Sequence, residues 1–285
     1  MEKKKNTRLT DALLLLMAFL PLALAMVLKI LTAPDTPLED GVVISGAMIY
    51  FTIPMPLQEW PITEAQVNSL AVILSVLGLC LYLTHGLKVI PDSKRQLAAE
   101  WIVDTVSKLV SSNMGEKFID FAPFVAGILA LSALSSLSSL LGLFPPTSDM
   151  NIVLGWAMLV FILITRSKLK GGLWAYIKSF FSPIFIFAPL NIIGEFATPI
   201  SMSVRHYGNV MSGMVISTLI AYALRNLSKL VLGWLPGALG NIPFLQVGLP
   251  AVLSLYFDIF SGCMQAFIFA MLTMMFVATA SPEEE

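Results

Sequence analysis

The chain has 285 residues, of which 57% are hydrophobic and only 12% are charged, and its mean hydropathy is +0.83. Soluble globular proteins carry about 25% charged residues, so the composition excludes that class and indicates an integral membrane protein. A net charge of −1 and scattered basic residues give no reason to expect a nucleic-acid partner. CxxC, HExxH and GxxxxGK motifs are absent from the sequence, so we expect no metal site, no cofactor and no self-contained catalytic centre. Cys80 and Cys263 lie in apolar runs, where we expect small buried hydrophobic residues.

The first predicted element is an apolar run from Asp11 to Leu31 that follows the basic segment MEKKKNTR. A signal peptide shares these features, but the run reaches about 20 residues and no clear cleavage site of small residues follows. We therefore expect an uncleaved transmembrane helix. Residues 32–64 hold five acidic residues and five prolines but no Lys or Arg, which places them outside by the positive-inside rule.

The second predicted span covers about residues 66–87 and ends in HGLKVIPDSKRQ, whose three basic residues mark the cytoplasmic side. Residues 94–110 are too polar to span a bilayer. Their charged residues Glu100, Asp104 and Lys108 recur at i, i+4, while apolar side chains share the opposite arc. This pattern predicts an amphipathic helix in the cytoplasmic interface.

Two further spans, Phe121–Phe144 and Asn151–Thr165, are joined by a turn, PPTSDMN, that carries an acid and no base and is expected outside. The basic segment RSKLKGG then returns the chain to the cytoplasm. Residues 173–188 are aromatic and interrupted by proline, which predicts an interfacial or re-entrant segment. Small residues of the first span recur at a spacing that favours close helix packing: Ser132, Ser135, Ser139 and Gly142.

The last two predicted helices are too long to stand upright in a bilayer. The first runs from about Leu190 to Val231, or about 60 Å, and the second from Val247 to Thr279, or about 50 Å. The hydrocarbon core is about 30 Å thick, so both helices must tilt strongly or break. The sequence thus predicts an all-α polytopic membrane protein of about six spans, with both termini in the cytoplasm.

A polar stripe runs along the first of these long helices. At about 100° per residue, its members share one face: Thr198, Ser201, Arg205, Asn209 and Ser212. An arginine in the hydrocarbon costs about 3 kcal/mol, so Arg205 must face the protein interior or water and needs a partner. A stripe that only joins helices would need no more than Ser and Thr. Glu195 lies near the N-terminal end of the stripe, while Gly208 and Gly213 flank it and would let another helix approach.

A second stripe lies on the last helix, and its members are Ser254, Asp258, Ser261, Gly262 and Gln265. A carboxylate inside a membrane span is a candidate functional group, because its protonation state responds to desolvation. Two interpretations of Asp258 remain open at this point. It either exchanges an ion or serves as the structural partner of Arg205.

The segments PLNIIGEFATPISMSVRHYGNVMSG and YFDIFSGCMQAFIFAMLT resemble subunit a of the F-type ATP synthase membrane sector, from about residue 65 to 280. The resemblance divides the chain into an N-terminal helix with its external segment, 1–64, and an ion-translocating domain, 65–285. It implies that Arg205 faces a rotating ring of proteolipid c subunits, each with one ion-binding carboxylate. It also implies peripheral-stalk b subunits and a catalytic sector as partners, in the cell membrane.

Further site residues follow from the same resemblance. Asn209 and Gln265 are expected to flank the contact with the ring, and Asp258 stands where a His or an acid lines the outer half-channel. His206 is a common variant beside the arginine. Many bacterial members carry Glu where this chain has Met214, which suggests that Asp258 supplies the carboxylate from the opposite helix. We also count Glu195, His206, Ser201 and Ser254 with the ion pathway.

The order of these groups suggests a mechanism as a hypothesis. Glu195 lies about 15 Å along the helix on the cytoplasmic side of Arg205, and Asp258 about 10 Å from Gln265 toward the outside. H⁺ or Na⁺ would enter by one half-channel, ride the ring and leave by the other, while Arg205 blocks direct leakage. A self-contained secondary transporter or channel with an intramembrane Arg205–Asp258 site is the alternative. A scaffold subunit with no transport role is a third interpretation.

Overall fold

The computed structural model of the chain describes residues 2–32, 46–56, 58–91, 93–181, 185–232, 244–246, 248, 252–253 and 255–281. Nearly all regular structure in these residues is helical. Six helical segments are long and apolar enough to cross a membrane: Leu9–Thr32, Glu64–Thr84, Glu116–Leu141, Met150–Leu169, Phe185–Val231 and Leu255–Ala280. The prediction of an all-α polytopic membrane protein with about six spans is confirmed.

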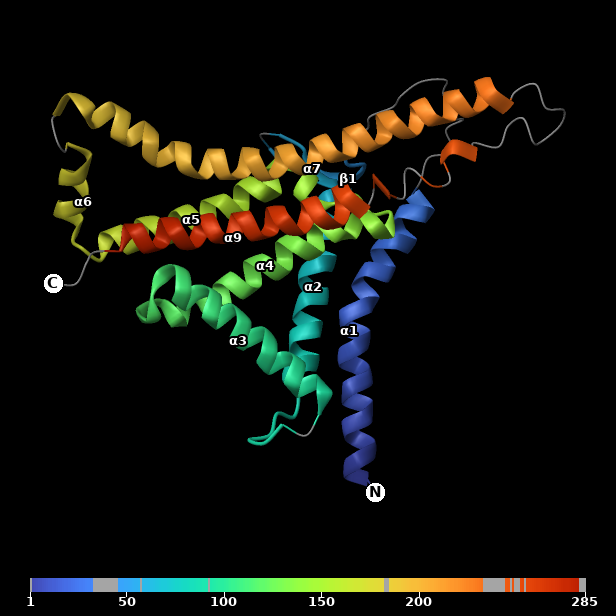
Figure 1. Ribbon diagram of the computed structural model, residues 1–285, viewed down its shortest axis with the longest axis horizontal. Coiled ribbons are helices and arrows are strands. Elements are labelled where there is room, and N and C mark those ends of the chain that lie inside the picture. Colours follow the sequence, from blue (N-terminus) through green and yellow to red (C-terminus); the bar gives the residue numbers. More distant parts are fainter. Residues whose placement is uncertain are drawn as a thin grey trace.

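The first two spans form a helical pair. α1 (Glu2–Thr32) packs along α2 (Glu64–Thr84), and the two stand side by side in Figure 1. Gly78 of α2 makes the close approach possible, because a Cβ at this position would lie 2.6 Å from the backbone nitrogen of Ala18. A larger residue at 78 would push the two helices apart.

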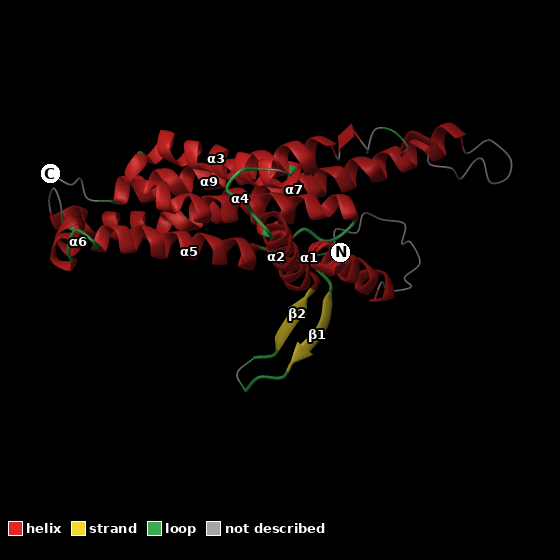
Figure 2. Cartoon of the chain, turned by 90° about the horizontal axis from the view of Figure 1, so that it is seen from below, coloured by secondary structure: helices red, strands yellow, loops and turns green. Residues whose placement is uncertain are grey.

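Between α1 and α2 in the sequence, the chain forms a small β-hairpin that the sequence analysis did not predict. β1 (Ile49–Ile53) pairs antiparallel with β2 (Trp60–Thr63), and Figure 2 shows the hairpin projecting from the helices. Its strands, IYFTI and WPIT, consist largely of β-branched and aromatic residues, which favour strands, although prolines interrupt the segment. Thr63 then caps α2, since its hydroxyl accepts a hydrogen bond from the backbone N–H of Gln66 at 3.4 Å.

The predicted amphipathic helix is present as α3 (Lys94–Met114). Lys108 and Asp104 form an ion pair of 2.7 Å on its exposed side, while Val110 and Met114 are buried on the other side. The amphipathic pattern of the sequence therefore located this helix correctly.

A helical hairpin follows, close to the predicted bounds. Its first arm consists of η1 (Glu116–Phe121), α4 (Ala122–Leu137) and η2 (Ser138–Leu141); after the turn η3 (Pro146–Ser148), the second arm is α5 (Met150–Leu169). The short helix α6 (Leu173–Phe180) then leads toward η4 (Phe185–Phe187) and the next long helix.

α7 (Ala188–Leu232) has 45 residues and agrees with the predicted helix to within two residues at each end. The short turn η6 (Phe244–Gln246) lies between it and the last helix. That helix differs from the expectation. Its described part starts with a π-helical segment, η7 (Leu255–Ser261), and continues as α9 (Gly262–Ala280). Of its predicted residues 247–279, several near the start lie outside the described residues.

The long helices are steeply inclined to the first pair. In Figure 1, α7 and α9 run side by side across the molecule, with α5 along them, whereas α1 and α2 stand across this direction. At about 1.5 Å per residue α7 is about 68 Å long, more than twice the hydrocarbon thickness. A helix of this length fits within a bilayer only if it tilts strongly.

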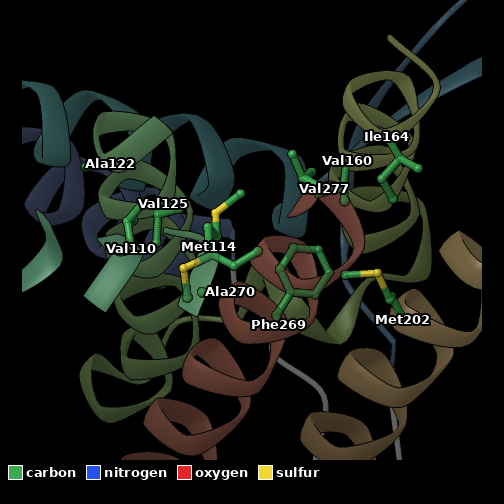
Figure 3. Packing of buried hydrophobic residues seen from close by; sticks show 11 residues of the cluster. Val110, Met114, Ala122, Val125, Val160, Ile164, Met202, Phe269, Ala270 and Val277 are labelled. Atoms are coloured by element: carbon green, nitrogen blue, oxygen red, sulfur yellow. The ribbon is translucent and has the colours of Figure 1, made fainter. Parts of the chain in front are cut away.

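One apolar cluster joins five of the helices (Figure 3). Phe269 and Ala270 of α9 lie at its centre, with Val125 of α4, Val160 of α5 and Met202 of α7 around them. Figure 3 shows the Phe269 ring facing Met202. This contact fixes one face of α7 against α9.

The structure corrects part of what the sequence analysis expected of the glycines and the cysteines. A Cβ on Gly213 would lie 3.2 Å from the Phe257 ring, as expected for close helix approach, but one on Gly208 would meet nothing within 4 Å. Cys80 and Cys263 are unpaired, but both are exposed rather than buried. Burial was the wrong expectation because apolar side chains of a membrane protein also face lipid.

Candidate functional site

The polar stripe of α7 lies on the face that the rest of the described chain leaves open. Ser201, Arg205, Asn209 and Ser212 are exposed. Within the described part of the chain, Arg205 makes no hydrogen bond and no ion pair. A guanidinium in apolar surroundings needs a counter-charge. A counter-charge from outside this part of the chain would meet this need.

Arg205 nevertheless lies beside the second slanted helix. It lines a shallow cavity of about 220 Å³ together with Phe276 of α9. One turn farther along α7, the Nδ2 amide group of Asn209 donates a hydrogen bond of 2.7 Å to Oε1 of Gln265. Gln265 is itself buried. The three polar residues that the resemblance singled out thus lie together, and the Asn209–Gln265 bond fixes α7 to α9 next to the arginine.

His206 lies about 100° around α7 from Arg205 and faces the interior of the protein. Its ring is fully buried. It makes T-shaped contacts with the rings of Trp156 and Phe269, at centroid distances of 6.3 and 5.5 Å. Its Nε2 atom lies 3.4 Å from the Ser132 hydroxyl. Adjacency to Arg205 in the sequence therefore does not place the two side chains on one face. This geometry makes His206 a packing residue between α4, α5, α7 and α9.

On one side of Arg205, Glu195 is held by a lysine that the sequence analysis did not single out. Lys168 Nζ of α5 donates to both carboxylate oxygens of Glu195, at 2.8 and 2.6 Å. Tyr176 of α6 donates its hydroxyl to the same carboxylate at 3.5 Å. Partial burial and the negative charge of Glu195 raise the pKa of Tyr176 above its ordinary value, so the phenol remains a donor at neutral pH.

Two cavities connect Glu195 with Arg205. One, of about 230 Å³, is lined by Glu195, Thr198 and Phe276. The other is lined by Thr198, Phe276, Ser201 and Arg205. Because they share Thr198 and Phe276, the two cavities adjoin. Thr198 and Ser201 thus line the space between the arginine and the Glu195–Lys168 ion pair.

Lys168→Met is expected to lower the free energy of unfolding by about 1–2 kcal/mol, because it leaves a largely buried Glu195 carboxylate without its cation. Thermal unfolding of the purified protein measures the effect. Lys170→Met, two residues away and exposed, is the matched control and should leave the unfolding temperature unchanged. Equal unfolding temperatures for the two variants would show that the ion pair contributes nothing to the α5–α7 contact.

A larger cavity, of about 500 Å³, lies on the other side of Arg205. Asp258 and Met214 both line it, from η7 and α7 respectively, together with hydroxyls of Ser217 and Thr218. Arg205 forms no ion pair with Asp258, so the interpretation of Asp258 as its structural partner is wrong. Ser254, which the sequence analysis counted with the pathway, lies outside the described residues.

Some lining residues could not be recognised from the sequence. Lys168 stood among basic residues that were interpreted only as a marker of the cytoplasmic side, and Lys29 ends an apolar run with no visible partner. Ser139 and Gly142 were predicted to serve helix packing, yet both also line the larger cavity. Lys168, for example, pairs with Glu195, 27 positions away on another helix, a contact that no local pattern reveals.

The chain is similar in sequence to known proteins. The family described as the ATP synthase A chain matches residues 67–278. The ATP synthase subunit a of Acidothermus cellulolyticus is 33% identical over 217 residues, covering 72% of each chain. That of Bacillus pumilus is 33% identical over 220 residues, covering 73% of this chain and 88% of the relative.

A third relative, the ATP synthase subunit a, sodium ion specific, of Propionigenium modestum, is 26% identical over 266 residues, covering 82% of this chain and 84% of the relative. The matched region includes every element that carries the polar stripes. The chain therefore belongs to the ATP synthase A chain family, the ion-translocating and non-catalytic subunit a of the F-type ATP synthase membrane sector.

Proposed function

We propose that residues 65–285 of this chain form two half-channels for H⁺ or Na⁺ and that Arg205 is the fixed charge between them. One observation carries the proposal: Arg205 has no ion-pair partner among the described residues and lies on the open face of α7, between the cavity of Asp258 and that of Glu195. An unpaired charge in the membrane is too costly to keep unless a partner supplies the opposite charge. A ring of proteolipid c subunits, each with one carboxylate, is such a partner.

The chemistry follows from the cost of moving charge through lipid. A ring carboxylate crosses lipid only when it is neutral, that is, with its ion bound. Facing this chain, it loses the ion to water on one side and becomes an anion that Arg205 attracts. Arginine suits the role because its guanidinium stays protonated even when desolvated, whereas a lysine can lose its proton. The fixed charge then prevents ions from passing directly between the half-channels.

The two cavities suit opposite ends of the route. The Asp258 cavity serves as the outer half-channel, and the Glu195 cavity, near the basic segment that ends α5, serves as the cytoplasmic one. Each elementary charge that crosses a potential of 100 mV contributes about 2.3 kcal/mol. This free energy turns the ring, and the catalytic sector uses the rotation to make ATP.

The same proposal covers location and partners. The chain lies in the cell membrane, surrounded by lipid, with both termini in the cytoplasm, and the b subunits hold it against the turning ring. Membership in the ATP synthase A chain family favours this role over a self-contained transporter or a passive scaffold.

Cross-linking to the ring tests the open face directly. Ser212→Cys, in a background with Cys80→Ser and Cys263→Ser, is expected to form a disulfide with a cysteine on the outer helix of a c subunit in the assembled complex. Leu70→Cys is the matched control, because Leu70 is exposed on α2, away from the stripe. Cross-linking at Leu70 but not at Ser212, scored by gel mobility, would place the ring on another face.

A further inference from the structure

We propose that the N-terminal helix α1 forms part of the wall of the outer half-channel and that Lys29 is the positioning residue that α1 contributes to it. The inference rests on the proposed function of the Asp258 cavity. Lys29 and Asp258 line the same cavity of about 500 Å³. Figure 1 shows the C-terminal end of α1 reaching the layer of α7 and α9. Lys29 lies before residues 67–278, which match the family, so the family itself assigns this residue no role.

Three contacts along its length fix α1 in this position. In its N-terminal half, Asp11 accepts a 2.7 Å ion-pair contact from Arg95 of α3. In the middle, Gly78 lets α2 approach the α1 backbone closely. Near the C-terminal end, Lys29 Nζ lies 2.9 Å from Oε1 of Glu64. A helix held at three points along its length can serve as a fixed wall.

The two side chains of the Lys29–Glu64 ion pair differ in how far they are exposed beside the cavity. The Glu64 side chain is only 3% exposed, whereas that of Lys29 is 33% exposed. Glu64 also accepts a hydrogen bond of 3.1 Å from the backbone N–H of Phe144, a residue that lines the cavity. Burial and the charge of Glu64 raise the pKa of nearby Tyr50. The carboxylate is thus held behind the wall, and the ammonium group faces the cavity.

This arrangement determines which carboxylate meets the incoming cation. An unneutralised Glu64 beside the cavity would attract H⁺ or Na⁺ and compete with Asp258. Lys29 acts as an internal cation that occupies Glu64. Among the described residues that line the cavity, Asp258 is the one acid. Lys29 is a positioning residue that keeps ion binding at Asp258.

Chemical modification of a cysteine tests the charge at position 29. Lys29→Cys, in the assembled complex without Cys80 and Cys263, is expected to lower ion-driven ATP synthesis about threefold or more. Aminoethyl methanethiosulfonate, added from outside, restores an ammonium group and should restore most of the rate. The sulfonatoethyl reagent adds a negative charge of similar size and should not. Ile30→Cys, exposed on the neighbouring position, is the matched control and should respond to neither reagent.

The result would overturn the inference if both reagents acted alike or if the cysteine introduced at position 29 did not react. Asp258→Cys, labelled from outside with a membrane-impermeant maleimide, separates this failure from that of the proposed function. Labelling at 258 without labelling at 29 defeats only the role of α1. Absence of labelling at 258 defeats the outer half-channel itself.

A second variant keeps the inference testable if Lys29→Cys does not assemble. Glu64→Gln retains size and the acceptor for Phe144 but leaves the Lys29 charge unneutralised at the cavity. The external ion concentration for half-maximal synthesis is expected to rise about threefold or more, and added inert salt should reduce the shift. A purely structural ion pair would change the amount of complex but not this concentration, and that outcome would contradict the inference.

Discussion

We expect Arg205→Ala to lower the rate of ion-driven ATP synthesis by about two orders of magnitude or more. The reason is that an anionic ring carboxylate facing α7 loses its counter-charge, a loss worth about 3 kcal/mol or more in a buried setting. Assembly should survive, because Arg205 has no partner within the described chain whose contact would be broken. ATP synthesis driven by an imposed ion gradient in reconstituted vesicles measures the effect.

Two controls make this result specific. Arg225→Ala removes the same residue type from the same helix, away from the stripe, and should retain most of the rate. Passive ion flux through Arg205→Ala vesicles should rise, because the charge that separates the two half-channels is gone. Coupled synthesis near the normal rate in Arg205→Ala would remove the basis of the proposed function.

The stripe illustrates how far the sequence could predict the site. Helical periodicity placed Ser201, Arg205 and Asn209 on one face, and the structure confirms that grouping. Periodicity also places His206 on a different face from Arg205, since consecutive residues of a helix point about 100° apart. The Asn209–Gln265 bond joins residues 56 positions apart. Only the resemblance to the family, not the local pattern, could pair them.

Tertiary contacts were harder to foresee for a physical reason. In a membrane protein, apolar residues face lipid as well as core, so hydrophobicity does not tell which helix faces which. Hydropathy and basic residues therefore located the spans but not the neighbours of α1. Lys29 meets Glu64 and Lys168 meets Glu195 only after folding. The hairpin of β1 and β2 was missed because two short strands interrupted by proline give a weak signal.

Asp258→Asn is expected to slow ion uptake from the outside about tenfold or more while the complex still assembles. Asparagine keeps the size of the side chain and can still form hydrogen bonds, but it has no negative charge with which to bind a cation. The rate of synthesis as a function of the external ion concentration measures the defect. Glu59→Gln, an exposed acid in the hairpin region, is the matched control and should leave the rate unchanged.

A second-site variant shows whether the cavity needs a carboxylate at one position or anywhere on its wall. Met214 lies on α7 and lines the same cavity as Asp258. Met214→Glu combined with Asp258→Asn returns a carboxylate to this cavity from the opposite helix and should recover at least part of the lost rate. If Asp258→Asn alone transports ions normally, Asp258 is a packing residue. If the double variant remains as slow as the single one, ion binding depends on the geometry of η7 rather than on the charge of the cavity.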